Sequence, residues 1–316
     1  MPQTSRDARW YRSMLYIPGY KLDWMLKAPK YGSDALMFDL EDSVAITQKA
    51  DARDAVATAI KELRTGAFGR FVRLNGWRTG CLLDDLFAVV IDGLDGVALP
   101  KTEDPESVAA IDLVLGELER SRGLPVGRIE ICPHAESAAA IYRLYEICMV
   151  SQRIKRAGCS GGPTPGGDAA RSLGLQLDDA ADEGFYFGAY SVLQARAAGI
   201  LQVEGAMTVR LDDLDLVRRI GERSKRLGAS FGPAIHPSHI PVINQIYSPS
   251  QDEIDEARDI VSFAAEATAR GEGAVRYNST RMVGYAPVRT ALNVLKRAQA
   301  AGIDIGDVPT LELPRF

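Results

Sequence analysis

Three carboxylates within four positions mark the first candidate chemical site in this sequence. The stretch ALMFDLEDSV, residues 35–44, runs from four apolar residues into Asp39, Glu41 and Asp42. Carboxylates that follow a buried segment are costly unless a positive group lies opposite them. We therefore expect a cation to face this cluster, with Asp39 as structural support and with Glu41 and Asp42 turned toward a pocket.

Other charged residues stand at the ends of later apolar runs. They are Arg73, Lys101, Glu136 and Asp168, at or after the third, fourth, fifth and sixth runs. If these runs are parallel strands of a barrel, their carboxyl ends meet at one face, which is where barrel enzymes carry their catalytic groups. The charged residues are then expected to converge on one pocket.

Each carboxylate also has a structural interpretation as the N-cap of the following helix. Asp42 taken alone favours that role, Asp168 taken alone is evenly balanced, and Glu136 competes with Ser137, a better capping residue. Arg73 is different, because an arginine flanked by apolar strand residues requires an anionic partner. A binding function is favoured for Arg73.

The potential metal ligands point to a hard cation. His134, His236 and His239 do not have the spacing of a zinc motif such as HExxH. Two separated carboxylates with no soft ligands suit Mg²⁺, which takes one or two protein carboxylates and leaves other positions to water and substrate. With an arginine to hold a carboxylate, this describes a site for a small oxo or hydroxy acid.

The elements that must position these residues alternate between strands and helices. Eight apolar runs read as strands, at 13–19, 35–40, 70–75, 96–101, 128–134, 153–159, 205–207 and 231–237. Amphipathic helical stretches lie between them, for example at 48–64, 105–122 and 137–151. This pattern predicts an α/β TIM (β/α)8 barrel over residues 1–250. Because the seventh run is short, a doubly wound sheet stays open.

The pattern changes after residue 250 to two long helical segments, at 251–271 and 286–302. We expect residues 251–316 to form a helical extension that acts as a lid, without a core of its own. The glycine- and proline-rich stretch at 158–168 reads as a functional loop.

Composition excludes several classes of protein. The net charge of −5 and the pI near 5.4 give no electrostatic footprint for nucleic acid. The spacing of Cys81, Cys132, Cys148 and Cys159 indicates free thiols. The amino-terminal stretch lacks an apolar core of signal-peptide length, and no run reaches the length of a membrane span. We expect a cytoplasmic enzyme of small-molecule chemistry.

Eight motifs in order carry a resemblance that covers nearly the whole chain from about Arg12. They are RSMLYIPG, GSDALMFDLEDSVA, FVRLNG, DGVALPK, ICPHAES, GGDAARSLG, AIHPSHIPVIN and SPSQDEIDEARDIV. In this order they resemble the citrate lyase beta-subunit-like family of the HpcH/HpaI aldolase superfamily, which also includes malyl-CoA and citramalyl-CoA lyases. The resemblance implies a TIM barrel of the pyruvate-binding type.

The resemblance also implies roles for individual residues. Glu136 and Asp168 would bind Mg²⁺, and Arg73 would bind the substrate carboxylate. Glu41 and Asp42 would order water or substrate around the metal as catalytic groups. We expect Arg12 and Lys101 to contribute to substrate binding, and Asp42→Asn to lower activity more than Asp39→Asn at equal folded yield.

The implied reaction is the reversible cleavage of a 3-hydroxyacyl-CoA into an oxo acid and an acyl-CoA. Two alternatives remain open, a CoA-independent aldolase of the same superfamily and a partner-dependent subunit of the citrate lyase beta type. The resemblance implies homotrimers or hexamers in which the lid crosses between subunits.

Two departures from the family pattern concern acid–base chemistry. Gly284 and Tyr285 stand where many family members carry a lid aspartate. His134 enters the fifth-strand motif, where the structural role of a lone histidine is favoured over that of a proton donor.

Overall fold

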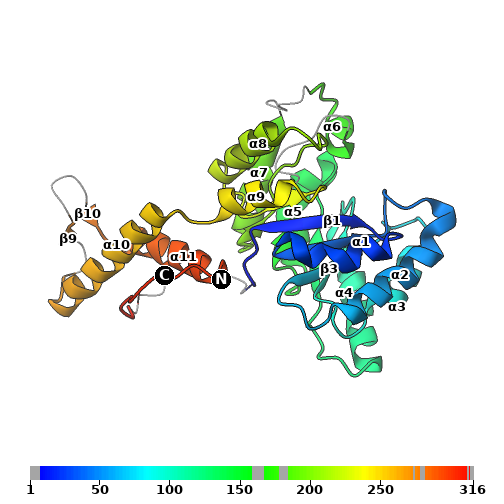
Figure 1. Cartoon of the computed structure of the whole chain (residues 1–316), viewed down its shortest axis with the longest axis horizontal. Helices are drawn as coiled ribbons and strands as arrows, with labels where there is room; N and C mark the ends of the chain where they lie inside the picture. The colour runs from blue at the N-terminus through cyan, green and yellow to red at the C-terminus, as the bar shows by residue number, and fades with distance from the viewer. Residues whose placement is uncertain are drawn as a thin grey trace. The chain divides into compact units, whose positions relative to one another are not determined.

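The computed structural model of the chain describes residues 8–158, 167–177, 184–272, 275–277, 282–311 and 313. Contacts divide them into two units, one ending at Tyr247 and one beginning at Ser248. The change of sequence pattern predicts this division at residue 250. Figure 1 shows both units and labels their α-helices and some of their strands.

Eight short strands of the first unit position the candidate residues. They are β1 (Ser13–Pro18), β2 (Ala35–Asp39), β3 (Gly69–Arg73), β4 (Gly96–Leu99), β5 (Glu130–Pro133), β6 (Arg156–Ala157), β7 (Gln202–Val203) and β8 (Gly232–Ala234). Seven overlap the predicted runs. The seventh strand lies earlier than the predicted run at 205–207, because its pairing with β6 uses Gln202 and Val203.

The strands pair in parallel. Six form one curled sheet in the order β5-β4-β3-β2-β1-β8, and β6 and β7 form a second sheet. Isolated parallel bridges join Ile131 to Ile154 and Glu204 to Phe231, between β5 and the β6 segment and between the β7 segment and β8. This arrangement is consistent with a TIM-like barrel. A doubly wound sheet would reverse its strand order at a switch point, and the observed order does not.

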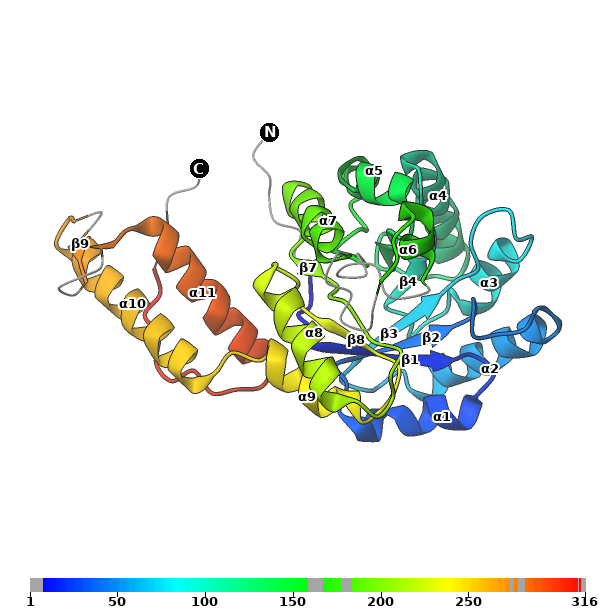
Figure 2. The same ribbon diagram turned by 90° about the horizontal axis from the view of Figure 1, so that it is seen from above.

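Helices follow the strands and surround them (Figure 2). They are α1 (Leu22–Lys27), α2 (Lys49–Glu62), α3 (Leu82–Val89), α4 (Pro105–Ser121), α5 (Ala138–Met149), α6 (Asp168–Leu173), α7 (Phe185–Ala197), α8 (Leu214–Arg226) and α9 (His239–Tyr247), with short 3₁₀ turns η1 (Ala28–Tyr31) and η2 (Ile46–Gln48). Ser137 caps α5 by accepting a hydrogen bond from the Ala140 N–H. Glu136 therefore has no capping role.

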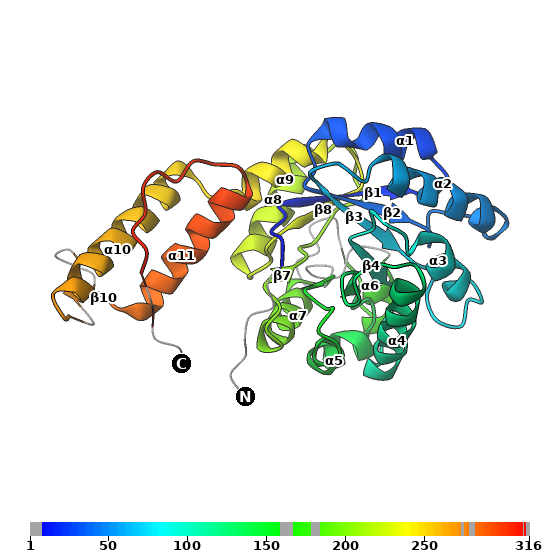
Figure 3. The same ribbon diagram turned by 90° about the horizontal axis from the view of Figure 1, so that it is seen from below.

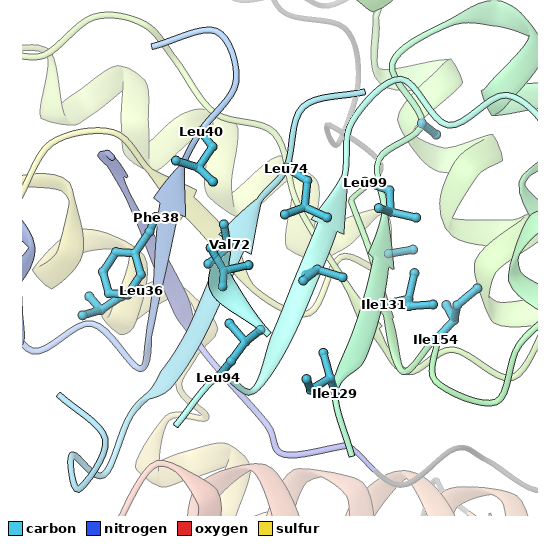
Figure 4. Close-up of a cluster of buried hydrophobic side chains, with 14 of the residues drawn as sticks. Leu36, Phe38, Leu40, Val72, Leu74, Leu94, Leu99, Ile129, Ile131 and Ile154 are labelled. Carbon is cyan, nitrogen blue, oxygen red and sulfur yellow. The ribbon is translucent and has the colours of Figure 1, made fainter. Parts of the chain in front are cut away.

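Alternation along the strands sorts side chains onto two faces. Leu36, Phe38 and Leu40 belong to the large core between strands and helices, part of which Figure 4 shows. Ala35 and Met37 belong to a smaller cluster on the opposite face, inside the curled sheet. Because successive strand residues point to opposite faces, Asp39 follows Met37 into the interior.

The second unit consists of α10 (Gln251–Ala269), α11 (Tyr285–Ala300) and an antiparallel pair of short strands, β9 (Val275–Arg276) and β10 (Met282–Val283). The two helices lie side by side (Figure 3). Their buried side chains form a cluster separate from the others, which includes Ile254, Val261 and Leu295. This corrects the expectation that the extension lacks its own core, since each helix buries its apolar stripe against the other.

Some of the predicted features fall outside the described residues. These are residues 159–166 of the glycine- and proline-rich loop, with Cys159 among them. No helix in the described ranges is both long enough and apolar enough to cross a bilayer.

Candidate active site

Asp39 and Arg73 form the best-defined contact of the site. They stand opposite each other in the register of β2 and β3, at the carboxyl ends of both strands. Arg73 donates from Nε to Asp39 Oδ1 and from Nη2 to Asp39 Oδ2, both at 2.7 Å. The backbone N–H groups of Glu41 and Ser43 donate to the same carboxylate. Asp39 therefore holds the guanidinium in one orientation.

This pair keeps both of its charges. Burial alone would raise the pKa of Asp39, but the hydrogen bonds and charge of Arg73 outweigh burial and lower it. Burial would lower the pKa of Arg73, but Asp39 and Glu41 raise it. The sequence therefore identified correctly that Arg73 needs an anionic partner, and Asp39 is the main one.

Glu41 is the buried carboxylate with the least support. Its Oε2 lies 3.2 Å from Arg73 Nη1 but makes no hydrogen bond of good geometry with any described group. Its Oε1 accepts a hydrogen bond from Lys101 Nζ at 2.7 Å. Burial raises the pKa of Glu41, and the nearby charges of Arg73 and Lys101 only partly oppose it.

Lys101 contacts carboxylates from three loops. Its Nζ lies 2.7 Å from Glu41, 3.3 Å from Asp42 and 3.2 Å from Asp168. Its backbone N–H donates to Glu136 Oε2 at 3.2 Å, and its φ of 51° is unusual for a residue with a side chain. Although partial burial would lower the pKa of Lys101, its carboxylate partners raise it. The structure thus brings Lys101 together with four of the predicted site residues.

Neither Asp42 nor Asp168 is an N-cap. Gln48 is the N-cap residue of α2. Gly167 is the N-cap residue of α6, so Asp168 is the first helical residue of α6. Asp168 pairs with Arg171 one turn later and with Lys101. Burial would raise the pKa of Asp168, but these two cations lower it. The Asp42 side chain is 61% exposed.

His134 and Glu136 occupy the end of β5. His134 Nδ1 lies 3.5 Å from Glu136 Oε1, and its buried Nε2 has no hydrogen-bond partner among the described residues. A Cβ added at Gly158 would lie 2.4 Å from His134 Cδ2, so the glycine lets the backbone approach the ring. Burial would raise the pKa of Glu136, but His134, Arg73 and Lys101 lower it. Glu136 is therefore an ionised carboxylate at the site.

Two interior residues that the sequence analysis missed lie near this cluster. The Tyr16 hydroxyl, from β1, donates to Oε2 of the buried Glu204 at 3.0 Å. Arg73 lies over the Tyr16 ring, with 5.8 Å from Cζ to the centroid. Burial raises the pKa of Glu204. The sequence signal was that Gln202 and Glu204 stand two positions apart, as residues on one face of a strand do. The predicted seventh run, at 205–207, begins after both residues and therefore missed it.

Arg12 is not brought to this cluster. It precedes β1, and it donates from N and Nε to Asp34 Oδ2 and from Nη2 to Oδ1, at 2.7 to 2.8 Å. Asp39 is level with Pro18, the last residue of β1. Six strand residues at about 3.3 Å each separate the two ends by roughly 20 Å. This corrects the expectation that Arg12 binds substrate together with Arg73 and Lys101.

A cavity of about 690 Å³ opens beside the cluster. It is lined by the loops after β2, β3 and β4, with Glu41, Asp42 and Lys101 among the lining residues. Ligand pockets commonly range from about 300 to 1,000 Å³, so this one is large enough for a ligand bigger than a small oxo acid.

The oxygen atoms of the cluster suit a hard divalent cation. Within the part of the chain that is described, no three His, Cys, Asp or Glu side chains form a metal-ligand group by themselves. Mg²⁺ needs only one or two protein carboxylates. Three carboxylates already converge on the Lys101 ammonium, which marks the cluster as a place that attracts a cation.

Comparison with known proteins identifies relatives of nearly equal length. Citrate lyase subunit beta of Escherichia coli K12 is 33% identical over 299 residues, which cover 94% of this chain and 96% of that protein. The L-malyl-CoA/beta-methylmalyl-CoA lyase of Cereibacter sphaeroides is 31% identical over 94% of this chain and 97% of its own.

Solved structures show the same fold at lower sequence identity. A citrate lyase from Burkholderia xenovorans LB400 gives a TM-score of 0.77 at 19% identity, covering 97% of this chain and 95% of its own. The CitE protein of Mycobacterium tuberculosis, solved with magnesium, acetoacetate and coenzyme A, gives 0.67 at 22% identity, covering 92% and 99%.

A family model described as HpcH/HpaI aldolase/citrate lyase matches residues 12–237. This range contains every strand of the first unit and all the candidate site residues. It confirms the resemblance drawn from the motifs and the predicted class of enzyme, a carbon–carbon lyase. The chain belongs to the HpcH/HpaI aldolase/citrate lyase family.

Proposed function

We propose that this protein is a magnesium-dependent lyase that cleaves or forms a 3-hydroxyacyl-CoA such as malyl-CoA, citramalyl-CoA or citryl-CoA. Cleavage releases an oxo acid and an acyl-CoA. The observation that carries the proposal is the meeting of Arg73 and Lys101 with several carboxylates at the carboxyl ends of the strands. The names of the relatives, citrate lyase subunit beta and malyl-CoA lyase, support the thioester class.

Glu136 and Asp168 would hold the magnesium ion. Both are ionised carboxylates next to Lys101, and their oxygen atoms are the ligands that Mg²⁺ prefers. When bound, the ion polarises the oxygen that becomes the oxo group and stabilises its negative charge. Lys101 would then give up one of its carboxylate partners and keep Glu41.

Arg73 would bind the carboxylate of the oxo acid through Nη1. Asp39 takes Nε and Nη2, which leaves Nη1, on the Glu41 side, as the nitrogen able to turn to a ligand. Because Asp39 already fixes the guanidinium, little side-chain entropy is lost on binding. The carboxylate is thereby held in register with the bond that breaks.

Glu41 would act as the general base in cleavage. Its Oε2 is buried and lacks a hydrogen bond, so it can accept the proton of the substrate hydroxyl and return it to the α-carbon of the thioester enolate left when the carbon–carbon bond breaks. A carboxylate with a raised pKa is a stronger base than an exposed one, and Lys101 on Oε1 orients it. Asp42 would order water at the mouth of the pocket.

A second cavity, of about 410 Å³, supports a CoA thioester over a free acid. It is lined by the end of β1, the segment after β8, and Trp24, Lys27, Lys30 and Tyr31. Lysines bind phosphates, and aromatic faces stack on nucleotide bases. We infer that the phosphorylated nucleotide half of CoA binds there, beside β1.

We infer that the two parallel sheets close into one (β/α)8 barrel. The bridges between β5 and the β6 segment and between the β7 segment and β8 support closure. So do the backbone bonds from Gly158 N to Pro133 O and from Gly205 N to Phe231 O. A closed barrel leaves no free sheet edge.

We also infer that the protein self-associates, as in the expected trimers or hexamers. The neighbouring helices α5 and α7 expose Tyr142, Tyr186 and Leu193. Arg196 is the single charged residue in the 13 of α7, and a helix that is apolar all round is normally buried. A monomer mass by light scattering would contradict this inference.

The lyase proposal is tested in the direction of synthesis. Purified protein is incubated with Mg²⁺, acetyl-CoA or propionyl-CoA, and glyoxylate, pyruvate or oxaloacetate, and the thioesters are analysed by mass spectrometry. We expect a new CoA thioester whose mass is the sum of the two reactants. Arg73→Met should abolish the product, while Arg12→Met, which removes an arginine at the other end of the strands, should not. No product from any pair would overturn the proposal.

The same experiment separates the two alternatives. A CoA-independent aldolase would join an aldehyde or oxo acid to pyruvate without a thioester. A partner-dependent subunit would bind Mg²⁺ and oxo acid, raising its melting temperature, with turnover only after a carrier-protein thioester is added.

A further inference from the structure

We propose that Arg78, in the loop after β3, binds a second carboxylate of the substrate, so that the site selects a dicarboxylic oxo or hydroxy acid. This inference rests on the proposed lyase function and names its substrate class. Arg78 and Trp77 line the 690 Å³ cavity, whose other lining residues include Glu41 and Lys101 of the candidate active site.

Arg78 is an exposed cation in a strained backbone conformation. Its φ is 66°, and within the described ranges the single other residue with a side chain and a positive φ is Lys101. Both line the same cavity. Residues are held in this region at a cost, and such positions cluster at functional sites. No hydrogen bond or ion pair joins Arg78 to any described residue, so its guanidinium is available to a ligand.

The loop that carries Arg78 is anchored on both sides. Before it, the Asn75 backbone N–H and side-chain amide donate to Asp85 Oδ2 at 2.8 and 2.6 Å. Arg53 Nε donates to the other oxygen of this carboxylate, Asp85 Oδ1, at 2.7 Å. After it, Thr79 Oγ1 donates to the Gly76 carbonyl at 2.8 Å. A ligand therefore meets a preorganised loop and loses little affinity to ordering it.

A second cation supports the same subsite. Lys49 is buried and also lines the cavity. Its Nζ donates to the carbonyls of Leu40 and Glu41 at 2.5 and 2.7 Å. An ammonium group has three donors, and the structure shows no described partner for the third. Lys49 can therefore add one hydrogen bond to a carboxylate in the cavity.

The acidic residues of the cavity oppose an anion only weakly. Glu41 and Asp42 are paired with Lys101, and Asp104 caps α4 by accepting from the N–H and hydroxyl of Ser107. Glu103 is exposed and is the lining acid without such a role. Glu103 therefore tests the sign of the ligand's charge. Removing the negative charge of Glu103 should strengthen the binding of an anion and leave the affinity for a neutral ligand unchanged.

The size of the cavity and the nature of its walls favour a longer acid. The cavity is larger than a three-carbon oxo acid requires, and Trp77, 44% exposed, offers an apolar wall for methylene groups. Arg73 Nη1 lies 3.2 Å from Glu41, which lines the cavity, so one carboxylate would bind at Arg73 and the other at Arg78. A monocarboxylic acid would leave Arg78 without a partner.

The test compares the affinity for two probes, oxaloacetate and pyruvate, by calorimetric titration at fixed Mg²⁺. The main variant is Arg78→Gly, because glycine adopts a positive φ without strain and should preserve the loop. Arg78→Asn, which also tolerates this conformation, is the second variant. Arg226→Gln, an exposed arginine on α8, is the matched control.

The wild type should bind oxaloacetate more tightly than pyruvate, and both Arg78 variants should lower this preference by about tenfold. Glu103→Gln should raise the affinity for oxaloacetate about two- to threefold, and Arg226→Gln should leave the ratio unchanged. An unchanged preference in both Arg78 variants, or no preference in the wild type, would overturn the inference.

Binding needs no turnover, so the two proposals fail separately. A protein that binds oxaloacetate through Arg78 but forms no thioester contradicts the lyase function alone. A protein that forms a thioester while its Arg78 variants keep the wild-type ratio of affinities contradicts this inference alone.

Discussion

Replacing Asp39 with asparagine tests how the site is built. The Asp39 carboxylate is almost fully buried and accepts two 2.7 Å hydrogen bonds from Arg73 and two from backbone amides. Removing one partner of a buried ion pair typically costs about 3–5 kcal/mol. Asparagine keeps one acceptor oxygen and Glu41 stays near Arg73, so we expect a loss at the lower end, about 3 kcal/mol.

The assay is urea unfolding followed by tryptophan fluorescence. All three tryptophans, Trp10, Trp24 and Trp77, precede Tyr247, so the signal reports the unit that contains the site. The matched control is Asp42→Asn, whose side chain is 61% exposed and should change stability by less than about 0.5 kcal/mol. Equal losses in the two variants would contradict the assigned contacts.

A double-mutant cycle isolates the pair. Asp39→Asn and Arg73→Gln each leave a partner unpaired, so the double variant should lose about 2 kcal/mol less than the sum of the single losses. Additivity within about 0.5 kcal/mol would refute the reasoning. Because Asp39 orients Arg73, the structure also reverses the activity order expected from sequence, and Asp39→Asn should impair turnover more than Asp42→Asn.

The pH dependence of this variant has a defined sign. The pKa of Asp39 is lowered in the folded protein, so its stabilisation is present above the unfolded carboxyl pKa of about 4 and is lost as the pH falls through the folded value. The difference in stability between the wild type and Asp39→Asn should therefore shrink below about pH 4. A difference that stays constant there would contradict the charge assignment.

Three further predictions concern stability and substrate binding. The pKa of Glu41 is raised in the folded protein, so its ionised form costs stability at neutral pH. Glu41→Gln should therefore stabilise the metal-free protein by about 1 kcal/mol, and this gain should shrink as the pH falls through the folded pKa. A loss of stability at pH 7 would contradict this prediction. Arg156 is fully buried, lies 2.7 Å from Glu130 and stacks on Tyr11 and Phe71. Arg156→Met should therefore lower the free energy of unfolding in urea by about 3–5 kcal/mol, and adding Glu130→Met should recover most of the loss. Arg12→Met should lower the melting temperature slightly, because its pair with Asp34 is partly exposed, and should leave KM unchanged; a severalfold rise in KM would restore Arg12 to the substrate site.

The sequence was most informative where periodicity and charge agreed. In the second and third strands, the alternation of apolar residues determines which face each side chain takes, and Asp39 and Arg73 end those strands on the same face. Their contact follows from pairing in register. The predicted runs were therefore enough to anticipate both the strands and the convergence of charged residues at their carboxyl ends.

The misses have physical reasons. Tyr16 lies in an apolar run and reads as a core residue, and nothing local indicates that its hydroxyl meets Glu204, 188 positions away. Arg12 precedes its strand, so the barrel geometry itself places it at the opposite end from Arg73. For α10 and α11, the amphipathic pattern predicts two helices, but it does not say which surface each apolar stripe will cover.

A crystal structure of the protein with magnesium and oxalate tests the central claim most directly. We predict an ion that contacts the carboxylates of Glu136 and Asp168, with oxalate bound to the ion and to Arg73. An ion held by other residues, or oxalate bound away from Arg73, would contradict the proposed site.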